Sequence, residues 1–207
     1  GHTADDQVET IIMHLLRGAG ISGLKGMTFR GLLPEWDAQI PLVRPLLNVR
    51  HEDALACCES RGVVPAEDAS NLDKSFFRNR LRHELLPLLE SYNPQVRESL
   101  LRMARGMAGD HEVLESATEE AWSQMQPQTG AGYVSLDLAA FRNLLRGLQR
   151  RVLRRAVAHL RPDLRDVDFL SIERGVSFLN VPSRAREMDL LQNIHLLADD
   201  KRAVLAE

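Results

Sequence analysis

The chain has 207 residues, a hydrophobic content of 44% and a formal net charge of −3 at pH 7. It is long enough for one large domain or two modest ones, and its weak net charge gives no general sign of nucleic-acid binding. No apolar run approaches the ~20 residues of a membrane span, which argues against a membrane protein. Cys57 and Cys58 are adjacent and form no CxxC pair or disulfide framework, which indicates a reducing, cytoplasmic setting.

The first half of the chain has the pattern of an α/β domain. A helix is predicted over 3–17, because Thr3 and Asp6 have capping-box spacing and apolar residues follow at helical spacing. The next stretch, RGAGISGLKGM, holds four glycines and is predicted to be irregular. An extended segment around 40–43 then leads into a helix over about 50–61. This order of elements is typical of the trailing part of an α/β sheet domain.

The second half is predicted to be mostly helical. Apolar periodicity predicts helices over about 74–90, from 96 to about 122, over 138–160 and over 166–179. The last segment, NIHLLADDKRAVLAE, has two apolar runs around a polar turn, which predicts a β-hairpin. We therefore expect a mainly α protein. Residues 1–80 would be the C-terminal part of a Rossmann-like α/β domain, and residues 81–207 a helical domain that ends in the hairpin.

Opposite charges gather in two neighbouring stretches of the second half. Residues 106–141 contain six acids and no Lys or Arg, whereas residues 142–174 contain nine arginines against four acids, a local excess of +5. Four arginines occur at every fourth position of a predicted helix and are called the arginine stripe: Arg142, Arg146, Arg150 and Arg154. Two interpretations stay open: the stripe pairs with the acidic helix of about 106–121, or it binds RNA phosphates.

Two adjacent aspartates, Asp5 and Asp6, fall in the first turn of the first predicted helix. Negative charge there interacts favourably with the helix macrodipole, by about 0.3–1 kcal/mol, so the pair has a purely structural explanation. Two carboxylates beside His2 at a helix N-terminus can also hold Mg²⁺ with ATP phosphates, or the ammonium group of an amine substrate. The spacing alone does not choose between these interpretations.

Four segments, HTADDQVET, LLRGAGISGLKGM, RPLL and ASNLDKSFFRNRLRHELLPLLE, have an order and spacing that resembles the tRNA(Ile)-lysidine synthase family of PP-loop ATP pyrophosphatases. The likeness covers roughly residues 1–95 and rests on the four segments together. It implies a PP-loop fold and a tRNA-modifying, ATP-dependent ligase. Such an enzyme adenylates C2 of the wobble cytidine in the CAU anticodon of tRNA(Ile), and the side-chain amine of free L-lysine then displaces AMP.

The same likeness implies roles for individual residues. The implied catalytic residues are Asp6, Arg78 and Arg80, and arginine suits phosphate contacts because its charged fork pairs with two oxygens at once. The implied ATP and lysine site also contains His2, Asp5, Gln7, Glu9 and Asn79, with Thr10 in the same segment and with Asp5 and Asp6 as Mg²⁺ ligands. The expected tRNA contacts are Arg82, His83, Arg142, Arg146, Arg150 and Arg154. Arg44 and Pro45 match the RPL element and have an architectural role.

The chain departs from the family pattern in two places. The family usually reads DPSN before the arginine-rich segment, whereas this chain has Asp68-Ala69-Ser70-Asn71. The SGGxDS loop that defines the family, and that holds phosphates on backbone N–H groups, does not occur in the chain. We therefore expect residue 1 to be an edge of a longer protein, and the 207 residues to be inactive by themselves.

Two other functions stay open. One is another PP-loop tRNA modifier, such as a 2-thiocytidine synthase, although that chemistry needs separated cysteines. The other is a non-catalytic RNA-binding module that keeps the framework of the family. The histidines lack the spacing of zinc ligands, so no zinc site is expected. Whether the protein forms an oligomer is also left open.

Overall fold

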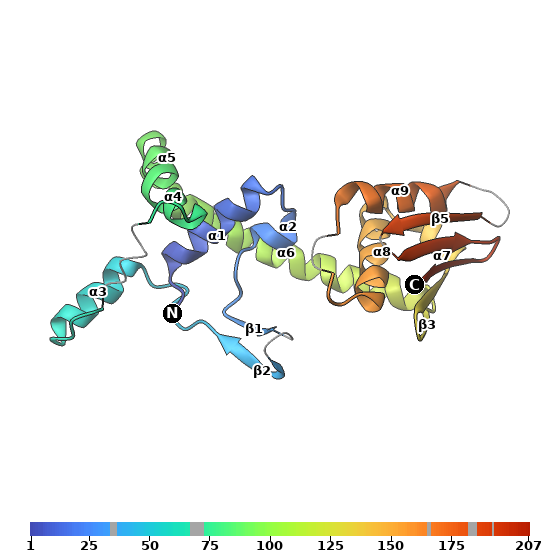
Figure 1. Ribbon diagram of the computed structural model, residues 1–207, viewed down its shortest axis with the longest axis horizontal. Helices are drawn as coiled ribbons and strands as arrows, with labels where there is room; N and C mark the ends of the chain where they lie inside the picture. The colour runs from blue at the N-terminus through green and yellow to red at the C-terminus, as the bar shows by residue number, and fades with distance from the viewer. Residues whose placement is uncertain (34–36, 67–72, 165–166, 182–185, 192) are drawn as a thin grey trace. The chain divides into compact units, whose positions relative to one another are not determined.

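The computed structural model describes residues 1–33, 37–66, 73–164, 167–181, 186–191 and 193–207. These residues form two compact units, Gly1–Glu112 and Val113–Glu207 (Figure 1). The fold class is mainly α, as predicted, with a small sheet near the C-terminus. None of the described helices is long and apolar enough to cross a membrane. A domain boundary between residues 80 and 81 stays a prediction, and the Asp68–Asn71 segment lies outside the described residues.

Helix α1 (Ala4–Leu16) opens the first unit and begins with the predicted capping box. The Thr3 side chain accepts a hydrogen bond from the backbone of Asp6, and the Asp6 carboxylate accepts one from the backbone of Thr3. The buried side of α1 is apolar. There Val8 and Ile12 form a small core with Leu81 and Leu86 of the later helical segment, which brings two parts of the sequence about seventy positions apart into contact.

The prediction that RGAGISGLKGM is wholly irregular was wrong, because it contains a one-turn helix, α2 (Ile21–Leu24). The turn after α2 depends on Gly26, whose backbone has a φ of +70°. A Cβ at Gly26 would lie 2.7 Å from the amide oxygen of Gln7. The glycines of this segment therefore serve turns and a close approach to α1, and glycine content alone gave no sign of the helical turn between them.

The remaining elements of the first unit follow the predicted order. Strands β1 (Arg30–Leu33) and β2 (Asp37–Val43) form a two-stranded antiparallel sheet, and helix α3 (His51–Ser60) follows. A helical run then consists of α4 (Phe77–Arg80), the π-helical turn η2 (Leu81–Leu85) and α5 (Leu86–Tyr92). It is called the 77–92 run below. Helix α6 (Val96–Gln124) begins in the first unit and ends in the second.

The second unit contains a five-stranded antiparallel sheet with the strand order β3-β4-β7-β6-β5. Its strands are β3 (Gln128–Gly130), β4 (Tyr133–Asp137), β5 (Arg186–Leu191), β6 (Ile194–Ala198) and β7 (Arg202–Ala206). The predicted C-terminal hairpin is confirmed as β6 and β7. It is only part of a larger sheet, because β5 pairs with β6 and β4 pairs with β7.

Three helices complete the second unit: α7 (Leu138–Asn143), α8 (Arg146–Leu160) and α9 (Phe169–Asn180). The prediction of a single helix over 138–160 was wrong, since Leu144 and Leu145 have extended backbones and separate α7 from α8. The fully buried side chains of all three helices and of the sheet form one core. Gly175 of α9 allows close packing there, because a Cβ would lie 2.7 Å from side-chain atoms of Leu153 and Leu190.

Candidate functional site

The acidic first segment and the arginine-rich segment meet in the first unit. Glu9 is fully buried, and its two carboxylate oxygens accept hydrogen bonds from Nε of Arg78 and Nε of Arg82, each at 2.6 Å. Oδ1 of Asp6 lies 3.1 Å from Nη2 of Arg78 and 3.8 Å from Nη2 of Arg82. We call Asp6, Glu9, Arg78 and Arg82 the four-charge cluster. Its two carboxylates and two guanidinium groups balance in charge.

Helical spacing brings the four side chains together. Asp6 and Glu9 are three residues apart on α1, and Arg78 and Arg82 are four residues apart on the 77–92 run, so each pair shares one face of its helix. The small apolar core beside them holds these two faces against each other. A buried carboxylate is costly unless its oxygens are paired, and the two arginines satisfy both oxygens of Glu9.

The Asp6 carboxylate is held ionised by its neighbours. Burial by itself would raise the pKa of Asp6, but hydrogen bonds from the backbone N–H and hydroxyl of Thr3, with the charges of Arg78 and Arg82, outweigh it and lower the pKa. The hydrogen bond to Glu9 raises the pKa of Arg82, so this guanidinium also stays charged. The cluster therefore keeps a fixed negative charge on Asp6 at neutral pH.

This lowered pKa makes the contribution of Asp6 to stability depend on pH. Because the pKa of the folded state lies below the unfolded value of about 3.9, the contribution is complete above that value and is lost as pH falls through the folded pKa. We expect the chain to be more stable than its Asp6→Asn variant at pH 7, with the difference shrinking below about pH 4. Urea unfolding of both proteins between pH 7 and pH 3 measures this; a constant difference would contradict it.

Asp5 contacts other partners than Asp6 does. Its Oδ2 accepts a hydrogen bond from the backbone N–H of His51, the first residue of α3, at 2.7 Å. Its Oδ1 lies 3.0 Å from Nη1 of Arg97 on α6, and Nε of Arg97 donates to Glu90 at 2.5 Å. Arg97 was not predicted as a site residue, because it lies 92 positions from Asp5 and outside the four quoted segments. Glu90 ends the fourth segment, but no role was predicted for it.

The same contacts bear on the predicted Mg²⁺ site. Both oxygens of Asp5 and both oxygens of Asp6 already face donors or cations of the protein. No group of three or more His, Cys, Asp or Glu side chains within the described ranges could hold a metal ion. Each oxygen of the aspartate pair thus already has a partner within the protein, and the role of the pair as a metal site stays a prediction.

Two other predicted site residues, Gln7 and Asn79, form hydrogen bonds with backbone groups outside their own helices. The Gln7 amide donates to the carbonyl of Met27 at 2.9 Å and accepts from its N–H at 2.7 Å. Asn79 is buried, and its amide donates to the carbonyl of Asp73 at 2.8 Å. Both side chains thereby fix loops that border the four-charge cluster.

The other predicted site residues of the first unit differ in their exposure and in their contacts with the rest of the protein. His2 is half-buried and His83 is exposed. Arg80 is exposed; its backbone N–H donates to the carbonyl of Phe76, but no hydrogen bond or ion pair joins its side chain to the rest of the described chain. Arg44 donates to the carbonyl of Thr28 at 3.1 Å, a contact in keeping with the architectural role expected for the RPL element.

The arginine stripe lies along α9. Arg146 and Arg150 both pair with Glu173, whose pKa their hydrogen bonds lower. Arg142 donates to the carbonyl of Leu179 at 2.7 Å, and Arg154 donates to that of Val167, also at 2.7 Å.

The expected pairing of the stripe with the acidic helix was therefore wrong for these four residues. Two other arginines pair with the acidic helix instead: Arg151 with Glu115 and Arg155 with Glu119 of α6. Each lies one position after a member of the stripe. A one-residue step turns a helical side chain by about 100°, which directs these arginines to a different neighbour.

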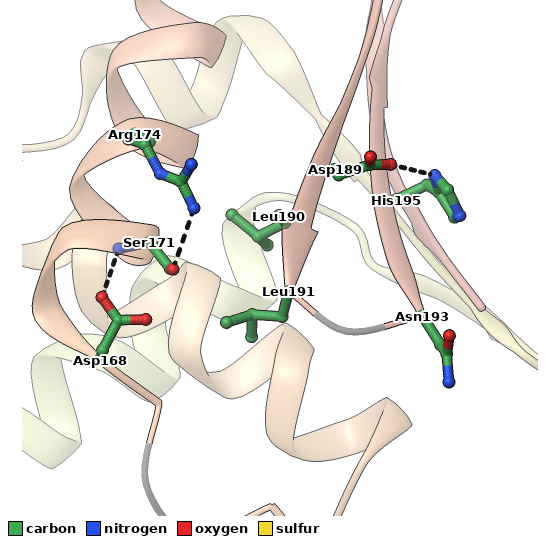
Figure 2. Close-up of a pocket in the computed structure, with 8 residues that line it drawn as sticks. All are labelled: Asp168, Ser171, Arg174, Asp189, Leu190, Leu191, Asn193 and His195. Carbon is green, nitrogen blue, oxygen red and sulfur yellow. Dashed lines mark hydrogen bonds and ion pairs between the residues drawn. The ribbon is translucent and has the colours of Figure 1, made fainter.

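A groove of about 620 Å³ in the second unit was not predicted. It lies between the first turns of α9 and the β5–β6 end of the sheet, as Figure 2 shows. On one wall Arg174 donates to Ser171 at 3.2 Å, and on the other His195 lies 2.8 Å from Asp189. The side chains come from segments with no motif, so the sequence gave no signal of this groove.

Comparison with known proteins places these features in a family. Residues 1–89 match the PP-loop domain family. The chain is 38% identical over 168 residues to the tRNA(Ile)-lysidine synthase of Geobacter sulfurreducens, an alignment that covers 81% of this chain and 34% of the relative. It is 30% identical over 195 residues to that of Clostridioides difficile, covering 94% of this chain and 41% of the relative. Over most of its own length the chain is similar to members of the tRNA(Ile)-lysidine synthase family.

This similarity confirms the family resemblance that the four segments indicated. A tRNA(Ile)-lysidine synthase of Nitrosomonas europaea is also similar, with 41% identity over 147 residues, 70% of this chain and 32% of the relative. Neither the 2-thiocytidine synthase nor the non-catalytic module is favoured. The chain spans about a third to two fifths of the length of these three members of the tRNA(Ile)-lysidine synthase family.

Proposed function

We propose that this chain is part of an enzyme that ligates free L-lysine to C2 of the wobble cytidine of tRNA(Ile), with a CAU anticodon, in the cytoplasm. ATP adenylates the cytidine, and the lysine amine then displaces AMP. One observation carries the proposal: the four-charge cluster brings the HxxDDQxET segment into direct contact with the RNRxRH segment. Similarity to the family supplies the chemistry that these two segments would serve.

Two residues of the cluster, Asp6 and Arg78, together with Arg80 beside it in the sequence, suit two parts of this reaction. Asp6, ionised at neutral pH, offers a carboxylate for the ammonium group of lysine. Arg78 is about one third exposed and the side chain of Arg80 is exposed without a described partner, so both guanidinium groups can approach phosphate oxygens and developing negative charge. We propose that Mg²⁺ accompanies ATP. Direct ATP or lysine contacts of His2, Gln7 and Asn79 stay predictions.

The absence of SGGxDS from the chain makes this proposal testable. We expect no pyrophosphate release from ATP by the 207 residues with tRNA(Ile) and lysine present. We expect release and lysine incorporation by a longer protein that joins an SGGxDS segment to this chain. Pyrophosphate release and incorporation of labelled lysine into tRNA measure both steps. Turnover by the short chain would refute its expected inactivity, and a longer protein that leaves tRNA unmodified would refute the proposed reaction.

For the arginine stripe we keep the proposal that it contacts tRNA. Substitution by Glu would place two more carboxylates beside that of Glu173, so Gln is the better replacement for Arg146 and Arg150. We expect the double Gln variant to bind tRNA more weakly and, because two phosphate contacts are lost, to reduce the slope of log affinity against log salt by about 1.4–1.8. Filter binding at several salt concentrations, with Arg161→Gln as the control, measures this. Unchanged affinity and slope would show that the stripe only stabilises the fold.

A further inference from the structure

The 77–92 run is joined to α1 at two places. The four-charge cluster forms the first connection, through Arg78 and Arg82 near the start of the run. The second connection passes from Asp5 at the start of α1 through Arg97 to Glu90 near the end of the run. Twelve residues separate positions 78 and 90, a distance of roughly 18 Å along an α-helix. Two charged contacts so far apart on one run restrict its angle to α1.

Apolar packing alone would fix this angle less well. The apolar contacts of α1 with the run come from aliphatic side chains, to which α6 adds Leu100 and Leu101, and hydrophobic attraction has no preferred direction. The second connection is also partly shielded from water, because the side chains of Asp5 and Arg97 are 27% and 33% exposed. Asp5 further holds the first N–H of α3, so three elements depend on one carboxylate.

We propose that Asp5 and Arg97 are positioning residues, which hold Arg78 in register with Asp6 and Glu9 by fixing α1 against the 77–92 run. Asp5 and Asp6 then have different roles. Asp6 belongs to the four-charge cluster, whereas Asp5 lies outside the cluster and fixes the geometry of the cluster. The geometric part of the inference concerns this chain alone. The consequence for catalysis rests on the proposed function.

The geometry is tested first in the 207-residue chain. Nε–H of Arg78 and of Arg82 donates to buried Glu9, so NMR should show slow solvent exchange for both. We expect Arg97→Gln to speed this exchange by about tenfold. Asp5→Asn, which keeps an acceptor for the His51 N–H, should have the same effect, and the double variant should add nothing. Exchange unchanged by Arg97→Gln would overturn the proposal.

Arg102→Gln is the matched control, because Arg102 also lies on α6 and donates to Ser99 of the same helix. In the Arg102→Gln variant, the Nε–H exchange rates of Arg78 and Arg82 should equal those of the unmodified chain. A control that speeds exchange as much as Arg97→Gln would attribute the effect to α6 in general and overturn the specific role of Arg97.

The catalytic consequence is tested in the longer protein with an SGGxDS segment. We expect Arg97→Gln and Asp5→Asn each to lower kcat by about tenfold to a hundredfold, with the KM for ATP nearly unchanged, because a misplaced group weakens the transition state more than substrate binding. A large loss with Asp5→Asn and none with Arg97→Gln would make Asp5 a direct ligand and overturn the proposal. A lower Tm with unchanged kcat would overturn it too. An unmodified protein without activity would instead refute the proposed function and leave the NMR result standing.

Discussion

We expect Glu9→Gln to lower the free energy of unfolding by about 2–4 kcal/mol, because the substitution removes the buried charge that two arginines share. Gln keeps one oxygen acceptor, but its amide group would face the second guanidinium with a donor. The side chains of Arg78 and Arg82 are 38% and 35% exposed and can turn to water, which keeps the loss below that of a fully buried ion pair. Urea unfolding followed by circular dichroism measures the change.

Glu84→Gln provides the control for this experiment. Glu84 also lies on the 77–92 run and pairs with a lysine, Lys74, but both side chains are at least half exposed. Its substitution should change the free energy of unfolding by no more than about 0.5 kcal/mol. If Glu9→Gln were as mild as this control, the four-charge cluster would contribute little to the stability of the first unit.

Arg78→Lys should be the most damaging conservative substitution for catalysis. In the longer protein with an SGGxDS segment we expect kcat/KM to fall by about a hundredfold. Arg78 contacts Glu9 through Nε and Asp6 through Nη2, and the single ammonium group of lysine cannot make both contacts and still present a planar fork to phosphate oxygens. Lysine incorporation into tRNA under single-turnover conditions measures the loss.

Arg105→Lys is the matched control, since Arg105 is exposed on α6 and donates only to the carbonyl of Leu101 in its own helix. It should leave kcat/KM within about twofold of the unmodified value. Melting curves for both variants separate lost chemistry from lost folding. An Arg78→Lys protein with normal turnover would exclude Arg78 from the reacting centre.

Local chemistry in the sequence was sufficient for several results. The capping box, the extent of α1 and α3, and the β6–β7 hairpin were predicted, because each depends on residues that are near one another in the sequence. The family was also evident from four short segments in a fixed order. Helical spacing also explains why Asp6 shares a face with Glu9, and Arg78 with Arg82, although these pairs were not predicted.

Only the tertiary structure decided which distant groups meet. In the folded chain the Asp5 carboxylate contacts His51 and Arg97, which are not partners of Asp6. The arginine stripe contacts α9 instead of the acidic helix. The tertiary structure also added β5 to a sheet of which only the hairpin had been predicted. The physical reason is the same each time. Periodicity fixes the face on which a side chain lies, whereas its partner depends on how apolar faces far apart in the sequence pack together.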